Sequence, residues 1–246
     1  MGKRLTQQRR GKGSPAYLSP GHRYVARAYY PHFVHATTTL GQVIDVLDDP
    51  ARTTLLADIL LQDGKRFYNL AAEGLAVGDK IDINSQSPAV PKGSIAPLAS
   101  IPEGTRIFNV ELRPGDGGKL SRTSGAAALL VAHDEETGLV SLQLSSKRVV
   151  TLRPTCLATI GVPSAGGRTE KPFKKAGAKR AAMAARNKYY PTVRGTAMNA
   201  YNHPHGGRSF GKPTTVSRHA PRGRKVGQIS ARSTGRRKSK SLGVQK

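Results

Sequence analysis

The stretch Thr54-Leu-Leu-Ala-Asp-Ile-Leu-Leu-Gln-Asp-Gly-Lys-Arg-Phe-Tyr-Asn-Leu70 decides the fold class of this chain. It consists of the short apolar, strand-like segment Thr54–Leu61 and the segment Lys65–Leu70, separated by Asp63-Gly64, a dipeptide typical of tight hairpin turns. Strand-like segments flank it at Gly41–Leu47 and Lys80–Asn84, and the second of these alternates with period two. Four or five short strands within about 50 residues predict a small closed β-barrel such as an OB-fold.

A second group of strands follows a proline-rich interval, which spans residues 88–104 and is predicted to be a linker. Strands are then predicted at Ile107–Leu112, Ala126–Ala132, Leu139–Leu144, Val149–Leu152 and Cys156–Val162. Glycine-rich turns separate them, so the pattern indicates a second small barrel, for which we favour an SH3-like fold. Periodicity alone does not distinguish it from another OB-type barrel.

The positive charge of the 246-residue chain is concentrated at its two ends. The chain has 40 Lys and Arg against 15 Asp and Glu, a net charge of +25. Residues 1–35 contain 7 Lys/Arg and no Asp/Glu. Residues 36–167 contain 12 Lys/Arg and 14 Asp/Glu, and residues 168–246 contain 21 Lys/Arg and a single acid. A field of this size favours a polyanion, with nucleic acid first and an anionic membrane second.

These patterns divide the mostly β chain into five predicted parts. They are a basic N-terminal extension (1–35), an OB-fold barrel (36–87), the linker (88–104), an SH3-like barrel (105–167) and a basic RNA-binding C-terminal extension (168–246). The extensions should order only where phosphates neutralise them, because an isolated segment of such charge repels itself.

Composition restricts the class of protein further. The single cysteine, Cys156, allows no internal disulfide and no cysteine-cluster zinc site, and its apolar neighbours predict a buried thiol. A protein with a single cysteine and no disulfide fits a reducing compartment. The sequence contains no run of roughly 18 apolar residues, so no membrane span is expected, and the basic start predicts no secretory signal.

The stretch Pro191-Thr-Val-Arg-Gly-Thr-Ala-Met-Asn-Ala-Tyr-Asn-His-Pro-His-Gly-Gly207 has neither helical nor strand period and predicts an irregular loop. An alanine-rich segment before it, Ala178–Lys188, predicts a short helix. The loop places mostly hydrogen-bond donors among small residues, and its glycines allow the backbone to approach another surface closely. This combination suits a loop that lies against phosphates and base edges.

The same loop resembles a signature of one ribosomal family. The motif Val193–Gly207, the openings Gln8–Gly13 and Ser19–Tyr24, and the tail segments Gly206–Pro213 and Ser217–Gly227 are similar to the universal large-subunit ribosomal L-two family, in its archaeal and eukaryotic branch. The resemblance covers nearly the whole chain. It implies an OB-fold followed by an SH3-like barrel, with extensions that thread into rRNA beside the peptidyl-transferase centre.

The resemblance also implies a function and a set of partners. The function is that of a cytoplasmic structural constituent of the large ribosomal subunit, which supports subunit association, tRNA positioning and peptide-bond formation. The implied partners are large-subunit rRNA, neighbouring ribosomal proteins, the small subunit through an intersubunit bridge and, indirectly, tRNA. Neither a membrane nor a second copy of the chain is expected. No cofactor is expected either, apart from Mg²⁺ associated with the rRNA.

We expect RNA contacts from Arg9, Arg10, His22 and Arg23 near the N-terminus, from Arg194, Asn199, His203, His205 and Arg208 in the loop, and from Arg218, Arg222, Arg224 and Lys225 in the tail. Lys147 and Arg148 fit RNA contact and solvated barrel surface equally well. His203 matches the family position linked to peptidyl-transferase activity. The sequence places no carboxylate beside it to orient the ring, so we expect it to stack on a base or bond a phosphate. Asn202 and Arg208 stand where many members have an acid and a third glycine, so the loop contacts there are expected to differ.

Two other functions compete with this interpretation. A chromatin-type nucleic-acid binder with basic tails has a similar composition, and it would bind duplex DNA in isolation. An enzyme built on the His203 loop would need a Ser/His/Asp, Cys/His or paired-carboxylate arrangement, and we identify no such set and no catalytic residue. The adjacent acids Asp48-Asp49 and Glu135-Glu136 are expected in turns or on the surface. His203-Pro-His205 offers two metal ligands where structural zinc needs four, so no metal site is predicted.

Overall fold

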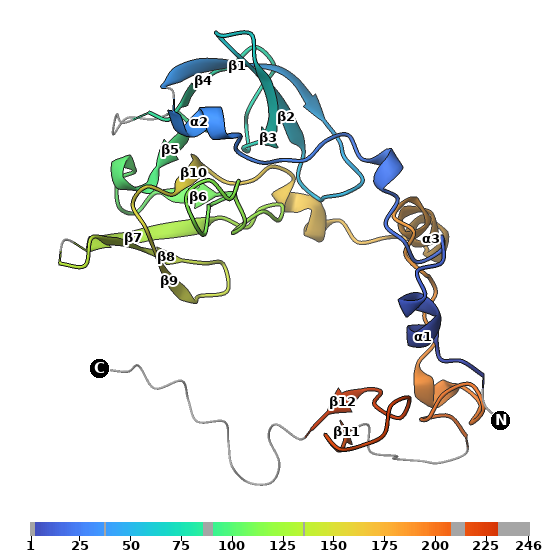
Figure 1. Cartoon of the computed structure of the whole chain (residues 1–246). Coiled ribbons are helices and arrows are strands. Elements are labelled where there is room, and N and C mark those ends of the chain that lie inside the picture. The colour runs from blue at the N-terminus through green and yellow to red at the C-terminus, as the bar shows by residue number, and fades with distance from the viewer. Residues whose placement is uncertain (1–2, 37, 86–90, 135, 208–214, 231–246) are drawn as a thin grey trace. The chain divides into compact units, whose positions relative to one another are not determined.

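The computed structural model describes residues 3–36, 38–85, 91–134, 136–207 and 215–230. They belong to two compact units (Figure 1). One unit, called the barrel unit below, is Pro20–Lys175. The other, called the basic unit, combines Met1–Ser19 with Ala176–Lys246, so it is built from both ends of the chain.

The first half of the barrel unit is the predicted OB-fold. Its strands are β1 (Thr39–Leu47), β2 (Leu56–Leu61), β3 (Arg66–Leu70), β4 (Lys80–Ile83) and β5 (Ile95–Pro97). Strand β1 pairs antiparallel with both β2 and β4, and a β-bulge between Val43 and Asp45 helps it to bend around the core. The β2–β3 hairpin confirms the Asp63-Gly64 turn, in which Gly64 N–H donates to the Leu61 carbonyl over 3.0 Å. The core between the strands is mostly aliphatic and also contains the buried rings of Phe67 and Tyr30.

The second half is the SH3-like barrel. It contains the 3-10 helix η2 (Leu98–Ser100) and the strands β6 (Arg106–Phe108), β7 (Ala128–Asp134), β8 (Leu139–Gln143), β9 (Val149–Leu152) and β10 (Leu157–Ile160). Strand β10 pairs with both β5 and β6, so it joins the two barrels into one continuous ten-stranded sheet within the described residues. Cys156 is fully buried in the core of this barrel, as its apolar neighbours predict.

A buried carboxylate ties several loops of the barrel unit together. Glu111 is fully buried and accepts hydrogen bonds from the backbone N–H groups of Gly117 (3.0 Å), Leu157 (3.0 Å) and Gly115 (3.3 Å). Its Oε1 also lies 3.1 Å from Nε2 of His35, in the short helix α2 (His32–Ala36). A buried carboxylate is tolerated because donors surround it on each side.

Four features of the barrel unit were not predicted from the sequence. Helix α2 and strand β5 were not predicted, because each spans only a few residues and shows no clear period. Asp49 lies in a turn, one of the two expected settings, and it is fully buried there. It accepts a hydrogen bond from Ala51 N–H (3.1 Å) and forms an ion pair with Arg52 (2.8 Å), so its charge is compensated inside the protein. A short 3-10 helix, η3 (Gly166–Glu170), follows the last strand of the sheet.

The basic unit has little regular structure. It contains α1 (Thr6–Gly11), α3 (Ala176–Ala185), the 3-10 helix η4 (Gly195–Ala197) and a parallel pair of two-residue strands, β11 (Thr215–Val216) and β12 (Gln228–Ile229). Helix α3 confirms the predicted alanine-rich helix and has no buried residue. None of the helices in the described ranges has the length and apolar character of a membrane-spanning segment.

Candidate nucleic-acid interface

The basic unit has no acidic side chain. Residues 1–19 contain five Lys/Arg and residues 176–246 contain 17, and neither segment contains Asp or Glu. Its cations therefore have no carboxylate side chain within their own unit. The barrel unit holds all 15 acids of the chain against 18 Lys/Arg. Because like charges repel one another, a unit of this charge attracts an external polyanion.

The loop at residues 191–207 is irregular, as predicted, but it is closed by its own backbone hydrogen bonds. The N–H groups of Asn202 and His203 both donate to the Asn199 carbonyl, over 2.9 and 3.2 Å. Gly207 N–H donates to the Met198 carbonyl over 3.1 Å, which brings the two ends of the turn together. These bonds satisfy part of the backbone internally and leave the exposed Arg194 and Asn199 side chains at the surface.

Two glycines make this closure sterically feasible. The imidazole ring of His203 lies directly on the backbone of Gly195, and a Cβ at residue 195 would lie 2.8 Å from Nε2 of that ring and still closer to other ring atoms. Gly206 is buried against the Asn199 backbone, and a Cβ there would also lie 2.7 Å from the Met198 carbonyl oxygen. Any larger residue at either position would therefore force the loop apart.

His203 has a defined hydrogen-bonding role within the loop. Its Nδ1 accepts a hydrogen bond from the backbone N–H of His205 over 3.1 Å, so in the neutral ring the proton must be on Nε2. The two imidazole rings meet edge to face, with centroids 4.9 Å apart. Partial burial lowers the pKa of His203 below its ordinary value, and the neighbouring His205 lowers it further. His203 is thus held neutral, with Nε2–H as a donor.

The N-terminal segment lies against the loop and supports it. Lys3 N–H donates to the Tyr201 carbonyl over 2.9 Å, and the Lys3 ammonium lies 5.2 Å from the centroid of the Tyr201 ring. At the end of α3, Asn187 adopts a left-handed backbone conformation that terminates the helix. Its side-chain amide donates to the carbonyls of Pro15 (3.3 Å) and Leu18 (3.2 Å). Both ends of the chain therefore build one site.

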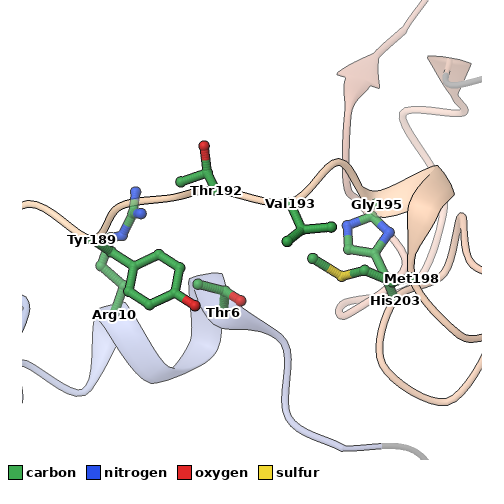
Figure 2. A pocket seen from close by; sticks show the side chains of 8 residues that line it. All are labelled: Thr6, Arg10, Tyr189, Thr192, Val193, Gly195, Met198 and His203. Carbon is green, nitrogen blue, oxygen red and sulfur yellow. The ribbon is translucent and has the colours of Figure 1, made fainter. Parts of the chain in front are cut away.

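A pocket of about 250 Å³ opens between α1 and the loop. Figure 2 shows Tyr189 and Arg10 at one end of this pocket and Val193, Met198 and His203 at the other. The lining combines apolar surface with hydrogen-bond donors and contains no carboxylate. It consists of Thr6, Arg10, Tyr189, Thr192, Val193, Gly195, Met198 and His203.

The structure brings part of the predicted contact set together. Arg10 lines the pocket with His203, and Arg9 lines a neighbouring hollow with Asn199. Arg194 and His205 belong to the same loop. The exposed Arg218, Arg222, Arg224 and Lys225 lie between β11 and β12 of the same unit. His22 and Arg23 are exposed in the 3-10 helix η1 (Gly21–Arg23) of the barrel unit, and Arg208 lies outside the described residues.

Sequence reasoning missed the residues that shape this site without carrying charge. Tyr189 and Met198 line the pocket, and Asn187 fastens the N-terminal segment. Asn187 lies two residues beyond the end of α3, where Asn commonly terminates helices, but the predicted helix Ala178–Lys188 ran through it. Neither its conformation nor its tertiary partners were predicted. Among the described residues, no group of three or more His, Cys, Asp or Glu could hold a metal ion.

A family model and individual relatives both connect this chain with one family of ribosomal proteins. A family model described as "Ribosomal Proteins L2, C-terminal domain" matches residues 91–226. The chain is 47% identical to large ribosomal subunit protein uL2 of Methanothermobacter thermautotrophicus, over 97% of this chain and 100% of the relative. It is 48% identical to the uL2 protein of Natronomonas pharaonis, over 96% of this chain and 97% of the relative. It is also 48% identical to the uL2 protein of Hyperthermus butylicus, over 97% of this chain and 100% of the relative.

Proposed function

The chain belongs to the uL2 family of large ribosomal subunit proteins, and we propose that its basic unit binds large-subunit rRNA beside the peptidyl-transferase centre. As a family member it is a structural constituent of the large subunit. The finer roles that we propose are support of subunit association through an intersubunit bridge, of tRNA positioning and of peptide-bond formation. Neighbouring ribosomal proteins and, indirectly, tRNA complete the proposed partners.

The observation that carries this proposal is the acid-free unit built by both chain ends around the loop at residues 191–207. Its exposed Lys and Arg side chains can neutralise phosphates and release counterions, which supplies sequence-independent affinity for RNA. The closed loop presents its donors on a defined backbone, so it adds geometric selectivity. The barrel unit, with nearly balanced charge and its own cores, supplies a platform.

A structural role for His203 follows from its tautomer. A general base near neutral pH must offer an unprotonated nitrogen to the reacting group. In His203, Nδ1 accepts from the His205 N–H and Nε2 carries the proton, so the neutral ring offers a donor to RNA instead. We therefore assign the ring a contact with a phosphate or base acceptor, and we assign the chemistry of peptide-bond formation to the RNA rather than to this protein.

The five-part division of the chain is retained as a proposal, with boundaries at 35, 87, 104 and 167. The proposed RNA contacts are those expected from the sequence. They are Arg9, Arg10, His22, Arg23, Arg194, Asn199, His203, His205, Arg208, Arg218, Arg222, Arg224 and Lys225. Those on the basic unit should contribute most, because no acid of that unit competes with the phosphates.

The proposal is tested by sedimentation of a native lysate, after a salt wash of its ribosomal particles, through a sucrose gradient. The fractions are then analysed by mass spectrometry. We expect the chain in the large subunit and its release only after RNase treatment. Recovery in light or DNA-bound fractions would favour the chromatin-type alternative. A paired variant, His203→Ala, should reduce the yield of large subunits that withstand the salt wash and leave thermal unfolding of the barrel unit unchanged.

A further inference from the structure

The pocket between α1 and the loop has the size of a site for one small group. Its volume of about 250 Å³ is several times the roughly 30 Å³ that a water molecule occupies in the liquid. It lies just below the roughly 300–1,000 Å³ of typical small-molecule sites. A duplex or a folded peptide segment is too large for it, whereas a single heterocyclic base fits.

The lining of the pocket matches the chemistry of a nucleotide. Tyr189 is 56% exposed and offers a ring face for stacking, and Val193 is 57% exposed at the other end of the pocket (Figure 2). Arg10 supplies a guanidinium, Thr6 supplies a hydroxyl, and His203 supplies its Nε2–H. The charged and imidazole groups are donors and no carboxylate is present, so the occupant should present acceptors and carry negative charge.

We propose that this pocket receives one unstacked nucleotide of the bound rRNA, with its base stacked on Tyr189 beside Arg10 and its remaining acceptors toward the Nε2–H of His203 at the other end. This inference rests on the proposed rRNA binding and specifies its recognition element. Proteins that recognise RNA by sequence commonly splay out an unpaired base and stack it on an aromatic side chain. The pocket would thus fix the register of the loop on the RNA, while the surrounding cations supply affinity.

Arg9 and Arg10 offer a matched pair of positions for the test. Both lie in α1 and carry the same charge, but Arg10 lines this pocket whereas Arg9 lines the neighbouring hollow. Tyr189→Leu removes the stacking ring, and Tyr29→Leu is its control, because Tyr29 is an exposed tyrosine of the barrel unit and does not line this pocket. Large subunits assembled with each full-length variant are probed at nucleotide resolution for 2′-hydroxyl flexibility.

We expect the same single unpaired nucleotide to become several-fold more reactive with Tyr189→Leu and with Arg10→Gln. The Arg9→Gln and Tyr29→Leu subunits should leave the reactivity of that nucleotide unchanged. Ultraviolet crosslinking of wild-type subunits should join Tyr189 to the same nucleotide. A control variant that alters this nucleotide as strongly as its partner would overturn the assignment to the pocket.

The outcomes separate this inference from the proposed function. If the variants stay in the large subunit and no nucleotide changes reactivity, the inference is wrong and the rRNA-binding function stands. If the wild-type chain does not sediment with the large subunit, both are wrong. A further arm titrates the purified chain with the four nucleoside monophosphates. Micromolar binding that Tyr189→Leu abolishes, without any change in rRNA reactivity, would make a soluble nucleotide the occupant and overturn the assignment to RNA.

Discussion

Replacement of Glu111 by Gln probes how strongly the barrel unit depends on its buried carboxylate. Glutamine has nearly the same shape, so no cavity forms, but one acceptor oxygen becomes an NH₂ donor. If the NH₂ group replaced Oε2, the N–H groups of Leu157 and Gly115 would both lose their acceptor. The amide should therefore turn its NH₂ toward His35, whose ring nitrogen can accept by a change of tautomer. The Gly117 N–H is then left buried and opposite a donor.

The expected loss in the free energy of unfolding follows from the hydrogen bonds that Glu111→Gln disrupts. A buried donor left unsatisfied costs about 1–3 kcal/mol, and a hydrogen bond to a charged acceptor contributes about 1.5–3 kcal/mol. We expect the free energy of unfolding to fall by about 2–4 kcal/mol. At about 2–4 °C per kcal/mol for a unit of this size, Tm should fall by about 4–16 °C.

The assay is thermal unfolding of the full-length protein, followed by circular dichroism in the β-sheet region. Glu136→Gln is the control, because it makes the same chemical change on an exposed residue and should alter stability by less than about 0.5 kcal/mol. If Glu111→Gln melted within about 2 °C of the wild type, the four contacts of this carboxylate would not be net stabilising and the argument would fail.

Three further predictions concern the loop and the buried thiol. The pKa of His203 is lowered in the folded loop, so the unfolded loop binds the proton at higher pH, and loop stability should decline as pH falls below about 6.5. In an NMR titration, His203 should titrate below 6.5, and His205→Ala should move its pKa upward. Gly206→Ala should sharply reduce salt-resistant incorporation into large subunits, whereas Gly177→Ala, where a Cβ meets nothing within 4 Å, should not. Equal incorporation of the two would contradict the close packing at Gly206. Burial raises the pKa of the Cys156 thiol to about 11, so the folded protein should resist thiol reagents at pH 8 and react only when denatured.

The strands of the barrel unit were largely predictable because they are either alternating segments or short apolar runs, and β2 and β10 are of the second kind, buried on both faces. Strand β8 shows this alternation, with Val140 and Leu142 buried between half-exposed neighbours. Strand β9 was placed with its observed bounds for the same reason. Strand β5 could not be identified in this way, because its three residues are held by pairing with β10 and β4 rather than by a local pattern.

The cationic character of the candidate interface was predictable, but its construction was not. Charge is a property of composition, so the segregation of Lys and Arg to the two ends is visible in the sequence. The meeting of those ends depends on single contacts, such as Lys3 with Tyr201 and Asn187 with Pro15, which carry no sequence pattern. Tyr189 acquires its place in a pocket only through that meeting.

The construction of the basic unit from both ends of the chain has a consequence for synthesis. Lys3, Pro15 and Leu18 leave the translating ribosome early, but their partners Tyr201 and Asn187 are made only after the whole barrel unit. At roughly 5–20 residues per second, this delay is roughly 10–40 s. Both barrels can fold on the nascent chain during that time, whereas the unit that carries the loop can close only when synthesis is nearly complete. Translation itself thus sets the order in which the platform and the RNA-binding element mature.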